Sequence, residues 1–238
     1  MHMMAKTPFP VMIFAAGFGR RMGALTKDKP KPLVPVKGRA LIDYTVDIAR
    51  ESGAQTILVN LHYKHQMLAD HLRDAPVQTR LELPDILETG GGLKAALPQL
   101  GAGPVVTINS DAIWQGENPI AALRARWQPE RMEALLLCIE RTRAHGHSGA
   151  GDFLLAENGC LQRGGNLVYT GVQIIKTEGL MAIEQRAFSL NLLWAQMIER
   201  QGVYGAVYRG NWCDVGHPEG LACAQNMLSH SNMPKANR

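Results

Sequence analysis

The sequence lacks several features that mark other classes of protein. It contains no apolar run of 18 residues, and its first ten residues, Met1–Pro10, hold no long apolar stretch. A membrane-spanning helix and a secretory signal are therefore not expected, and we predict a cytoplasmic protein. The 25 basic and 21 acidic residues do not gather into runs of five or six like charges. Neither nucleic acid nor a membrane is expected as the main partner.

Cysteine is also scarce. The four cysteines are separated by at least nine residues and form no CxxC pair. A zinc site or a redox pair is not indicated, and a chain of 238 residues is too long to be a small disulfide-stapled scaffold. We expect reduced, packed cysteines at Cys138, Cys160, Cys213 and Cys223.

Glycine, in contrast, is abundant, at 24 of 238 residues, and 46% of the chain is hydrophobic. This composition is typical of a globular protein with a real core, and the length favours one domain. We predict a single domain over 8–230, with one half at 8–140 and a second half at 141–230, followed by a tail at 231–238.

Apolar segments alternate with helical patterns in the first 139 residues. Several of the apolar segments are continuous, as expected for strands covered on both faces of a parallel sheet. The pattern predicts an α/β fold with a Rossmann-like, doubly wound, mixed but mostly parallel sheet and flanking helices. Residues 142–165 are interpreted as loops or a small hairpin. The predicted strands are Val11–Ala16, Thr56–Asn60, Val105–Ser110, Ala134–Ile139, Leu167–Ile175 and Val203–Tyr208. The predicted helices are Leu41–Ser52, Tyr63–Leu72, Gly92–Leu100, Asn118–Gln128, Ser189–Gln201 and Pro218–Ser229.

The first predicted strand runs directly into a glycine-rich turn, Gly17–Gly23. Glycine lets backbone N–H groups approach a phosphate without a side-chain collision. The spacing is GxGxxxG, and three prolines follow within twelve residues, which excludes the helix of a GxGxxG dinucleotide site. The chain also has no GxxxxGK[ST] motif. An open loop with Arg21 and Lys31 beside a triphosphate fits best, although a plain turn with solvated arginines stays open. Arg20 and Lys27 are interpreted as surface charges.

Two motifs together resemble a known family. The segments AAGFGRRM (Ala15–Met22) and PKPLVP (Pro30–Pro35) are similar to the signature of sugar-1-phosphate nucleotidylyltransferases, which have a GT-A-like α/β fold. The resemblance implies that Arg21 and Lys31 bind and polarise the nucleotide phosphates. It also places Ala15, Ala16, Gly17 and Gly19 against the nucleotide.

A second glycine cluster opens a predicted helix in the segment LETGGG, Leu87–Gly92. Three successive glycines suggest a loop that lets a flat ligand come close, rather than a plain turn. The resemblance implies that this loop packs on the nucleobase. Candidate residues for the base are Thr89, Gly90, Gly91 and Glu82.

Two aspartates follow predicted strands far apart in the chain. Asp111 ends an apolar strand, and Asp214 precedes the last predicted helix, where a capping role is the alternative. Mg²⁺ on a polyphosphate needs one or two carboxylates. The resemblance supplies the pairing, and it implies Mg²⁺ as cofactor, with Asp111 and Asp214 as ligands and Asp111 as a catalytic residue.

The acceptor side is expected within Gly151–Gly171. Asp152, Asn166 and Thr170 are candidate partners of the sugar or its phosphate, with turn or strand roles as the alternative. Many relatives carry Glu-Lys-Pro roughly where this chain has Gln162–Gly164.

The resemblance implies an enzyme that joins an NTP, here UTP, to a sugar 1-phosphate. The LETGGG segment and the lack of a long C-terminal extension resemble the short bacterial N-acetylmuramate-1-phosphate uridylyltransferase type, which works in peptidoglycan recycling. Alternatives are GTP with mannose 1-phosphate, CTP with a phosphorylated alcohol, and a nucleotide-binding regulatory module without catalysis. We expect a monomer or a small homo-oligomer.

Overall fold

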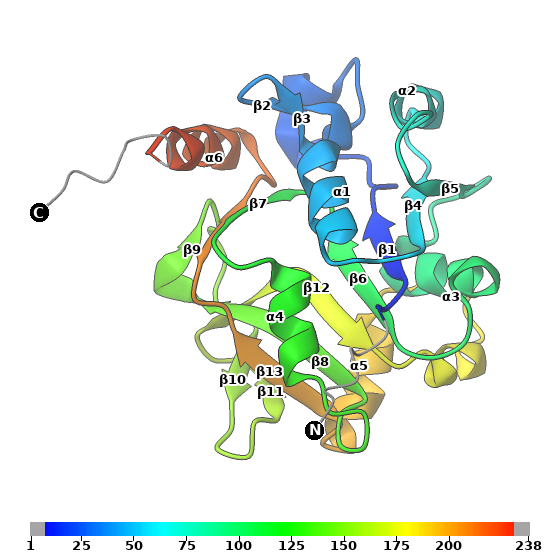
Figure 1. Cartoon of the computed structure of the whole chain (residues 1–238), viewed down its shortest axis with the longest axis vertical. Coiled ribbons are helices and arrows are strands. Elements are labelled where there is room, and N and C mark those ends of the chain that lie inside the picture. The colour runs from blue at the N-terminus through cyan, green and yellow to red at the C-terminus, as the bar shows by residue number, and fades with distance from the viewer. Residues whose placement is uncertain (1–7, 231–238) are drawn as a thin grey trace, which may run out of the picture.

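The computed structural model describes residues 8–230, so the predicted tail at 231–238 lies outside the described residues. Within residues 8–230 the centre is a nine-stranded sheet in the order β11-β10-β12-β6-β1-β4-β5, with β8 paired to β12 and β13 paired to β8 (Figure 1). Its strands are β1 (Val11–Phe14), β4 (Ile57–Leu61), β5 (Gln78–Leu81), β6 (Val105–Asn109), β8 (Ala134–Glu140), β10 (Phe153–Leu155), β11 (Leu161–Arg163), β12 (Leu167–Ile175) and β13 (Val203–Val207).

The sheet is mixed. Strands β6, β1, β4 and β5 run parallel, as do β8 and β13. Strand β12 pairs antiparallel with β6, β8 and β10, and β10 and β11 form an antiparallel hairpin. The predicted α/β fold class is confirmed, and the hairpin lies inside the segment predicted as loops or a small hairpin.

Helices cover both faces of the sheet (Figure 1). One buried cluster joins Val11 and Ile13 of β1 to α1 and α4, and a second joins Met12 of β1 to α3 and α5. Alternate side chains of β1 therefore enter opposite cores, as the pleat of a strand requires. The helices are α1 (Leu41–Glu51), α2 (His65–His71), α3 (Glu88–Leu100), α4 (Pro119–Arg126), α5 (Asn191–Glu199) and α6 (Pro218–His230), with short 3₁₀ turns at Arg20–Thr26, Lys31–Leu33, Arg141–Arg143 and Glu178–Ala182.

A small third layer lies beside the main sheet. Strands β7 (Ala112–Gln115), β14 (Asn211–Asp214) and β9 (Ala144–His145) form a sheet in the order β7-β14-β9, and β2 (Pro35–Val36) pairs with β3 (Arg39–Ala40). A third buried cluster packs α6 against both through Val36, Cys213 and Ala224. This layer carries the predicted metal ligand Asp214 toward the carboxyl end of the main sheet.

Local chemistry explains the helix ends. Gly53, with φ of 81°, follows α1 and supplies the left-handed conformation that stops the helix, as predicted. The Asn118 side chain accepts hydrogen bonds from the N–H groups of Ile120 and Ala121 at the start of α4.

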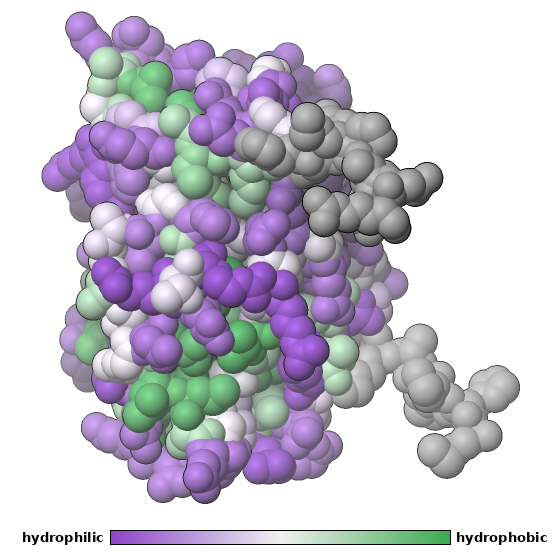
Figure 2. All heavy atoms as spheres, turned by 90° about the vertical axis from the view of Figure 1, so that its left-hand side faces the viewer, coloured by the Kyte–Doolittle hydropathy of each residue, from purple (hydrophilic) through white to green (hydrophobic). Residues whose placement is uncertain are grey.

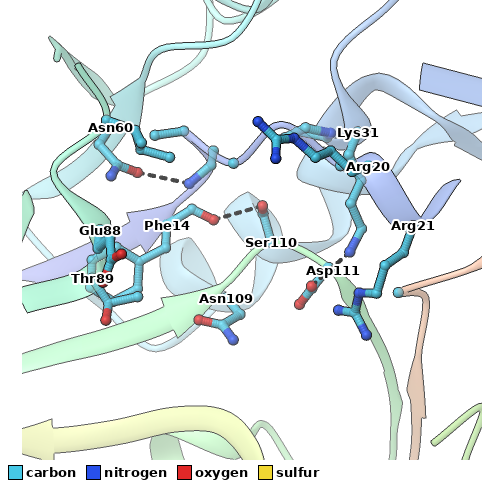
Figure 3. Close-up of a pocket in the computed structure, with 17 residues that line it drawn as sticks. Phe14, Arg20, Arg21, Lys31, Asn60, Glu88, Thr89, Asn109, Ser110 and Asp111 are labelled. Atoms are coloured by element: carbon cyan, nitrogen blue, oxygen red, sulfur yellow. Dashed lines mark hydrogen bonds and ion pairs between the residues drawn. The ribbon is translucent and has the colours of Figure 1, made fainter. Parts of the chain in front are cut away.

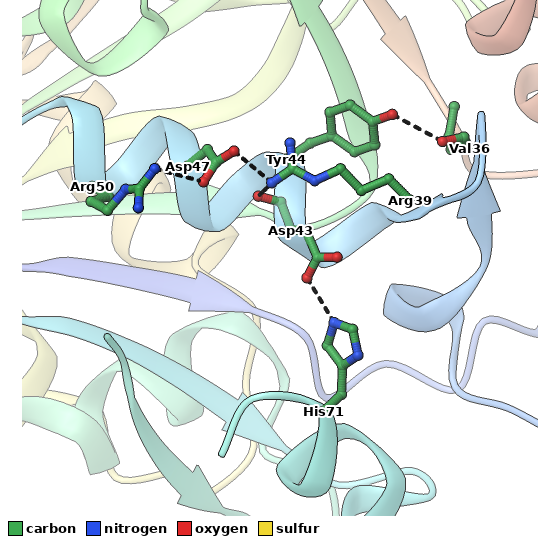
Figure 4. A network of polar contacts seen from close by, with 7 residues as sticks. All are labelled: Val36, Arg39, Asp43, Tyr44, Asp47, Arg50 and His71. Carbon is green, nitrogen blue, oxygen red and sulfur yellow. Dashed lines mark hydrogen bonds and ion pairs between the residues drawn. The ribbon is translucent and has the colours of Figure 1, made fainter. Parts of the chain in front are cut away.

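A polar network fixes α1 to its neighbours (Figure 4). Arg39 donates hydrogen bonds to the Asp47 carboxylate and the Asp43 carbonyl, and the Tyr44 hydroxyl donates to the Val36 carbonyl at 2.9 Å. His71 of α2 contacts the Asp43 carboxylate at 2.7 Å. The segment that follows the glycine turn is therefore anchored on α1.

The surface is mainly polar on the face that carries α6 (Figure 2). Hydrophilic side chains cover most of that face, and hydrophobic ones gather in its lower half (Figure 2). Within residues 8–230, no helix has both the length and the apolar character to cross a membrane. All four cysteines are free, and three of them are buried.

Candidate active site

The carboxyl ends of the parallel neighbours β1 and β6 open into a cavity of about 370 Å³. This is where open α/β sheets bind ligands, since the loops at these strand ends diverge. Figure 3 shows the Lys31, Arg21 and Asp111 side chains converging from different loops. The sequence-predicted residues that line this cavity are Ala15, Ala16, Gly17, Gly19, Arg21, Lys31, Thr89 and Asp111.

The two glycines of the first loop have different structural roles. A methyl group on Gly17 would meet no protein atom within 4 Å, so a ligand can approach the backbone there. Gly19 has φ of +65°, and a methyl group on it would lie 2.8 Å from Lys31 Cβ. Glycine at this position lets the Lys31 segment pack directly on the loop.

Lys31 and Asp111 form an ion pair, with Lys31 Nζ 2.7 Å from Asp111 Oδ2. The lysine side chain is 12% exposed and the aspartate side chain 29%. Burial alone would raise the pKa of Asp111, but the charge and hydrogen bond of Lys31, with the charge of Arg21, outweigh it and lower the pKa. Asp111 is therefore held as a carboxylate.

Asp214 reaches the same place from β14. The Val215 N–H donates to the Asp111 carbonyl at 2.8 Å, which joins the two acidic segments. Asp214 itself does not line the cavity, but Gly216 does, and a methyl group on Gly216 would lie 3.0 Å from Asp214 Oδ1 and 3.1 Å from Arg21 Nη2. Burial and the charge of Asp111 raise the pKa of Asp214 against the opposing effect of nearby basic side chains.

The two carboxylates fit a Mg²⁺ site that is completed by a substrate. Within residues 8–230, no group of three His, Cys, Asp or Glu side chains could hold a metal ion. Mg²⁺ does not require such a group, because phosphate oxygens and waters fill most of its six positions. The charge of Asp111 disfavours ionisation of Asp214, and a cation between them would relieve this repulsion.

A buried network ties the glycine loop to the segment before α3. The Ala15 N–H donates to Asn60 Oδ1 at 2.7 Å, and Asn60 Nδ2 donates to Glu82 Oε1 at 2.7 Å. The Leu87 N–H donates to the other oxygen of Glu82 at 2.8 Å. Glu82 is 2% exposed and its carboxylate is engaged by the protein, so the structure places it in this network and not on the wall of the first cavity.

The three glycines of the LETGGG segment do not form a loop. They lie in the first turn of α3, which begins at Glu88 rather than at the predicted Gly92. The N–H groups of Gly90 and Gly91 donate to the Phe188 carbonyl, and methyl groups on these glycines would lie 2.4 Å from the Phe188 ring and 2.3 Å from the Arg186 carbonyl oxygen. The structure thus places Gly90 and Gly91 in close packing on residues 186–188, which also cap the helix, and not on the wall of the first cavity.

A second cavity of about 260 Å³ adjoins the first and shares Phe14, Thr89 and Asn109 with it. Asp152, predicted on the acceptor side, lines this cavity, and its Oδ2 accepts a hydrogen bond from the Tyr169 N–H at 2.8 Å. The remaining lining residues are Phe153, Arg163, Tyr169, Gln173, Ser189, Leu190, Asn191 and Trp194.

Two other predicted acceptor residues are placed elsewhere. Thr170 is 2% exposed, and its hydroxyl donates to the Leu137 carbonyl at 2.6 Å. Asn166 is exposed in the turn between β11 and β12, where its carbonyl accepts from the Arg141 N–H at 2.9 Å. Neither residue lines the two cavities, and the structure gives Thr170 a strand role and Asn166 a turn role, the alternative that the sequence left open.

Sequence reasoning missed several residues of the site. Arg20 is exposed, as expected, but it also lines the first cavity, with its guanidinium 5.0 Å from the centre of the Phe18 ring. Asn109 lines both cavities, and the Ser110 hydroxyl donates to the Phe14 carbonyl at 2.7 Å, which joins β6 to β1. Their position in the sequence could have indicated a place in the site, because Asn109 and Ser110 immediately precede Asp111 at the end of a predicted strand.

Comparisons with known proteins agree with this geometry. Residues 11–183 match the family model of the MobA-like NTP transferase domain. The chain is 36% identical over 242 residues to an N-acetylmuramate alpha-1-phosphate uridylyltransferase of Caulobacter vibrioides, which covers 96% of this chain and 100% of that protein. It is 32% identical over 216 residues to the protein of the same name from Neisseria meningitidis, covering 86% and 92%.

A solved structure shares the fold. A putative glucose-1-phosphate thymidylyltransferase from Bacillus anthracis superposes with a TM-score of 0.76 at 17% identity, over 95% of this chain and 98% of that one. The family match, the two relatives and the converging basic and acidic side chains support one conclusion. The chain belongs to the sugar-1-phosphate nucleotidyltransferases with a MobA-like NTP transferase domain, and it is a nucleotidyltransferase.

Proposed function

We propose that this enzyme transfers a uridylyl group from UTP to N-acetylmuramate α-1-phosphate, giving UDP-N-acetylmuramate and pyrophosphate in peptidoglycan recycling. Two relatives that carry this activity in their names, each matching most of the chain, support the choice of substrates. The observation that carries the chemistry is the meeting of Lys31, Arg21, Asp111 and Asp214 beside an open glycine loop.

The nucleotide is assigned to the 370 Å³ cavity. Its phosphates lie along Ala15–Gly19, where Gly17 leaves the backbone open, and the base lies toward Thr89. The Asn60 and Glu82 side chains do not touch the ligand in this proposal. They fix the Ala15 end of the loop relative to the start of α3.

The reaction is a displacement at the α-phosphorus of UTP. An oxygen of the sugar phosphate forms a bond to this phosphorus while the bond to the bridging oxygen breaks, and pyrophosphate leaves with that electron pair. Arg21 and Lys31 stabilise the charge that develops on the phosphate oxygens. The attacking phosphate is already an anion at neutral pH, so no general base is needed. Catalysis is positioning and electrostatics.

Asp111 and Asp214 would hold Mg²⁺, which neutralises charge on the reacting phosphates when it is bound. Lys31 is paired with Asp111 in the free protein. Because Lys31 lines the nucleotide cavity beside Asp111, its ammonium group would also be within the reach of a phosphate bound there.

The acceptor sugar is assigned to the 260 Å³ cavity, which shares a wall with the nucleotide cavity. Most of its lining comes from residues 152–194, whereas most of the nucleotide cavity comes from residues 14–111. This division supports the proposed nucleotide half at 8–140 and sugar half at 141–230 of one domain.

Pyrophosphate release tests the proposal. The four NTPs are each combined with N-acetylmuramate 1-phosphate, N-acetylglucosamine 1-phosphate, glucose 1-phosphate and mannose 1-phosphate, with and without Mg²⁺. We expect turnover with UTP and N-acetylmuramate 1-phosphate that depends on Mg²⁺ and is abolished in Asp111→Asn. Turnover with GTP and mannose 1-phosphate alone would identify a guanylyltransferase. If no pair of substrates released pyrophosphate, a nucleotide-binding regulatory module would be favoured.

A further inference from the structure

Arg163 differs in charge from the other residues that line the second cavity. It ends β11, and within residues 8–230 it is the one basic residue that lines this cavity. The one acidic lining residue, Asp152, already accepts a backbone hydrogen bond from Tyr169. The other polar lining groups are neutral. A ligand that enters this cavity therefore meets one positive group, Arg163, and one carboxylate, Asp152, that is already turned to the Tyr169 N–H.

The Arg163 guanidinium is held in place without a counter-charge. It lies 5.1 Å from the centre of the Phe153 ring and 5.7 Å from the centre of the Trp194 ring. Its Nη2 donates to Asn191 Oδ1 at 2.8 Å, a neutral acceptor. Among the described residues no carboxylate forms an ion pair with it. The two rings and the Asn191 hydrogen bond hold the guanidinium against this wall of the cavity before any ligand binds.

This arrangement suits a carboxylate. A guanidinium carries five N–H donors in a planar fork, and one interaction with Asn191 leaves most of them available. Planar anions that accept two parallel hydrogen bonds match the fork best. The phosphate of the acceptor has to lie near Arg21 and Lys31 in the other cavity, where the reaction takes place. An anion beside Arg163 is consequently a second negative group, carried by the sugar itself.

We propose that Arg163 is a specificity-determining residue that binds a carboxylate on the acceptor sugar, and so selects acidic over neutral sugar 1-phosphates. The proposal rests on the proposed function in one respect, the placement of the acceptor in the second cavity. The lactyl carboxylate of N-acetylmuramate is a group of this kind. A neutral sugar leaves Arg163 without an anionic partner.

Steady-state kinetics with two matched pairs of acceptors test it, with UTP as donor. N-acetylmuramate 1-phosphate is compared with N-acetylglucosamine 1-phosphate, and glucuronate 1-phosphate with glucose 1-phosphate. Each pair differs in the carboxylate-bearing group. Because this group is remote from the reacting phosphorus, Arg163→Gln should raise KM for the acid about tenfold and leave kcat nearly unchanged. The neutral partner of each pair should keep its KM, and Arg163→Lys should recover part of the loss.

Arg131→Gln serves as the matched control, since Arg131 also stacks on an aromatic ring, 5.5 Å from the centre of Tyr204, but lines neither cavity. It should change KM for no acceptor. Calorimetric titration of the acceptors without UTP gives a second readout that does not need turnover, and the same loss for the acid alone is expected in Arg163→Gln.

The outcomes separate this proposal from the proposed function. One outcome is turnover of glucuronate 1-phosphate but not of N-acetylmuramate 1-phosphate, with a higher KM for the acidic acceptor alone in Arg163→Gln. It would contradict the proposed function and support the role of Arg163. An equal loss for both members of each pair would overturn that role and indicate a contact with the shared phosphate. No loss for either member, or a preference of the wild type for neutral acceptors, would overturn it as well.

Discussion

The buried pair Asn60–Glu82 offers the sharpest test of how the nucleotide loop is held. Asn60 is 3% exposed and accepts the Ala15 N–H while donating to Glu82. Asn60→Ala removes both hydrogen bonds and leaves the Ala15 N–H and one Glu82 oxygen without these partners. Each buried group left unpaired costs about 1 to 3 kcal/mol. We expect the free energy of unfolding to fall by about 3 kcal/mol.

The assay is urea unfolding followed by circular dichroism, together with KM for UTP. The KM should rise, because the loop that approaches the phosphates is no longer fixed at Ala15. Asn211→Ala is the control, since Asn211 is exposed and makes its side-chain hydrogen bond to Gln115 at the surface. A loss below 1 kcal/mol in Asn60→Ala, similar to that of the control, would refute the idea that this network holds the loop.

Three further predictions concern the glycines and the acidic pair. Gly17→Ala should leave the free energy of unfolding nearly unchanged, because a methyl group there meets no protein atom within 4 Å, yet weaken UTP binding measured by titration. Gly91→Ala should lower the unfolding midpoint in urea markedly, because its methyl group would lie 2.3 Å from the Arg186 carbonyl oxygen, and an unchanged midpoint would contradict the packing role. Burial of Asp111 opposes ionisation, but Lys31 and Arg21 lower its pKa below the ordinary 3.8. The ionised carboxylate of Asp111 thus stabilises the folded state above pH 3.8. The difference in free energy of unfolding between wild type and Asp111→Asn should therefore shrink as the pH falls below 3.8. Urea unfolding at a series of pH values measures this difference.

Sequence patterns predicted the buried strands well. The segment Leu167–Ile175 was predicted with the bounds that β12 has, because a strand buried on both faces is rich in apolar and β-branched residues. Strand β5 was not predicted, and β10 and β11 were predicted only as a small hairpin without bounds, with loops as the alternative. They are three or four residues long, and exposed side chains interrupt their apolar pattern. The resemblance carried by AAGFGRRM and PKPLVP implied that Arg21, Lys31 and Asp111 surround the nucleotide phosphates, and in the structure all three line one cavity.

Several predicted site residues have partners within the protein that the sequence did not reveal. Glu82, Thr170 and the glycines of LETGGG have the chemistry of ligand-binding residues, but a sequence does not show what each of them faces. In the fold their hydrogen bonds and close contacts are made with Asn60, Leu137 and Phe188. The acceptor cavity was only partly predicted for a related reason. Its aromatic wall joins Phe153 to Trp194, which lie 41 positions apart and meet only in the folded chain.

The central claim is that this chain joins UTP to N-acetylmuramate 1-phosphate. Phosphorus NMR of the two substrates with the enzyme and Mg²⁺ follows every phosphate at once. We predict that UDP-N-acetylmuramate and pyrophosphate appear in equal amounts, and that neither appears with Asp111→Asn. Unchanged spectra with the wild-type enzyme, or pyrophosphate without the sugar nucleotide, would contradict the account.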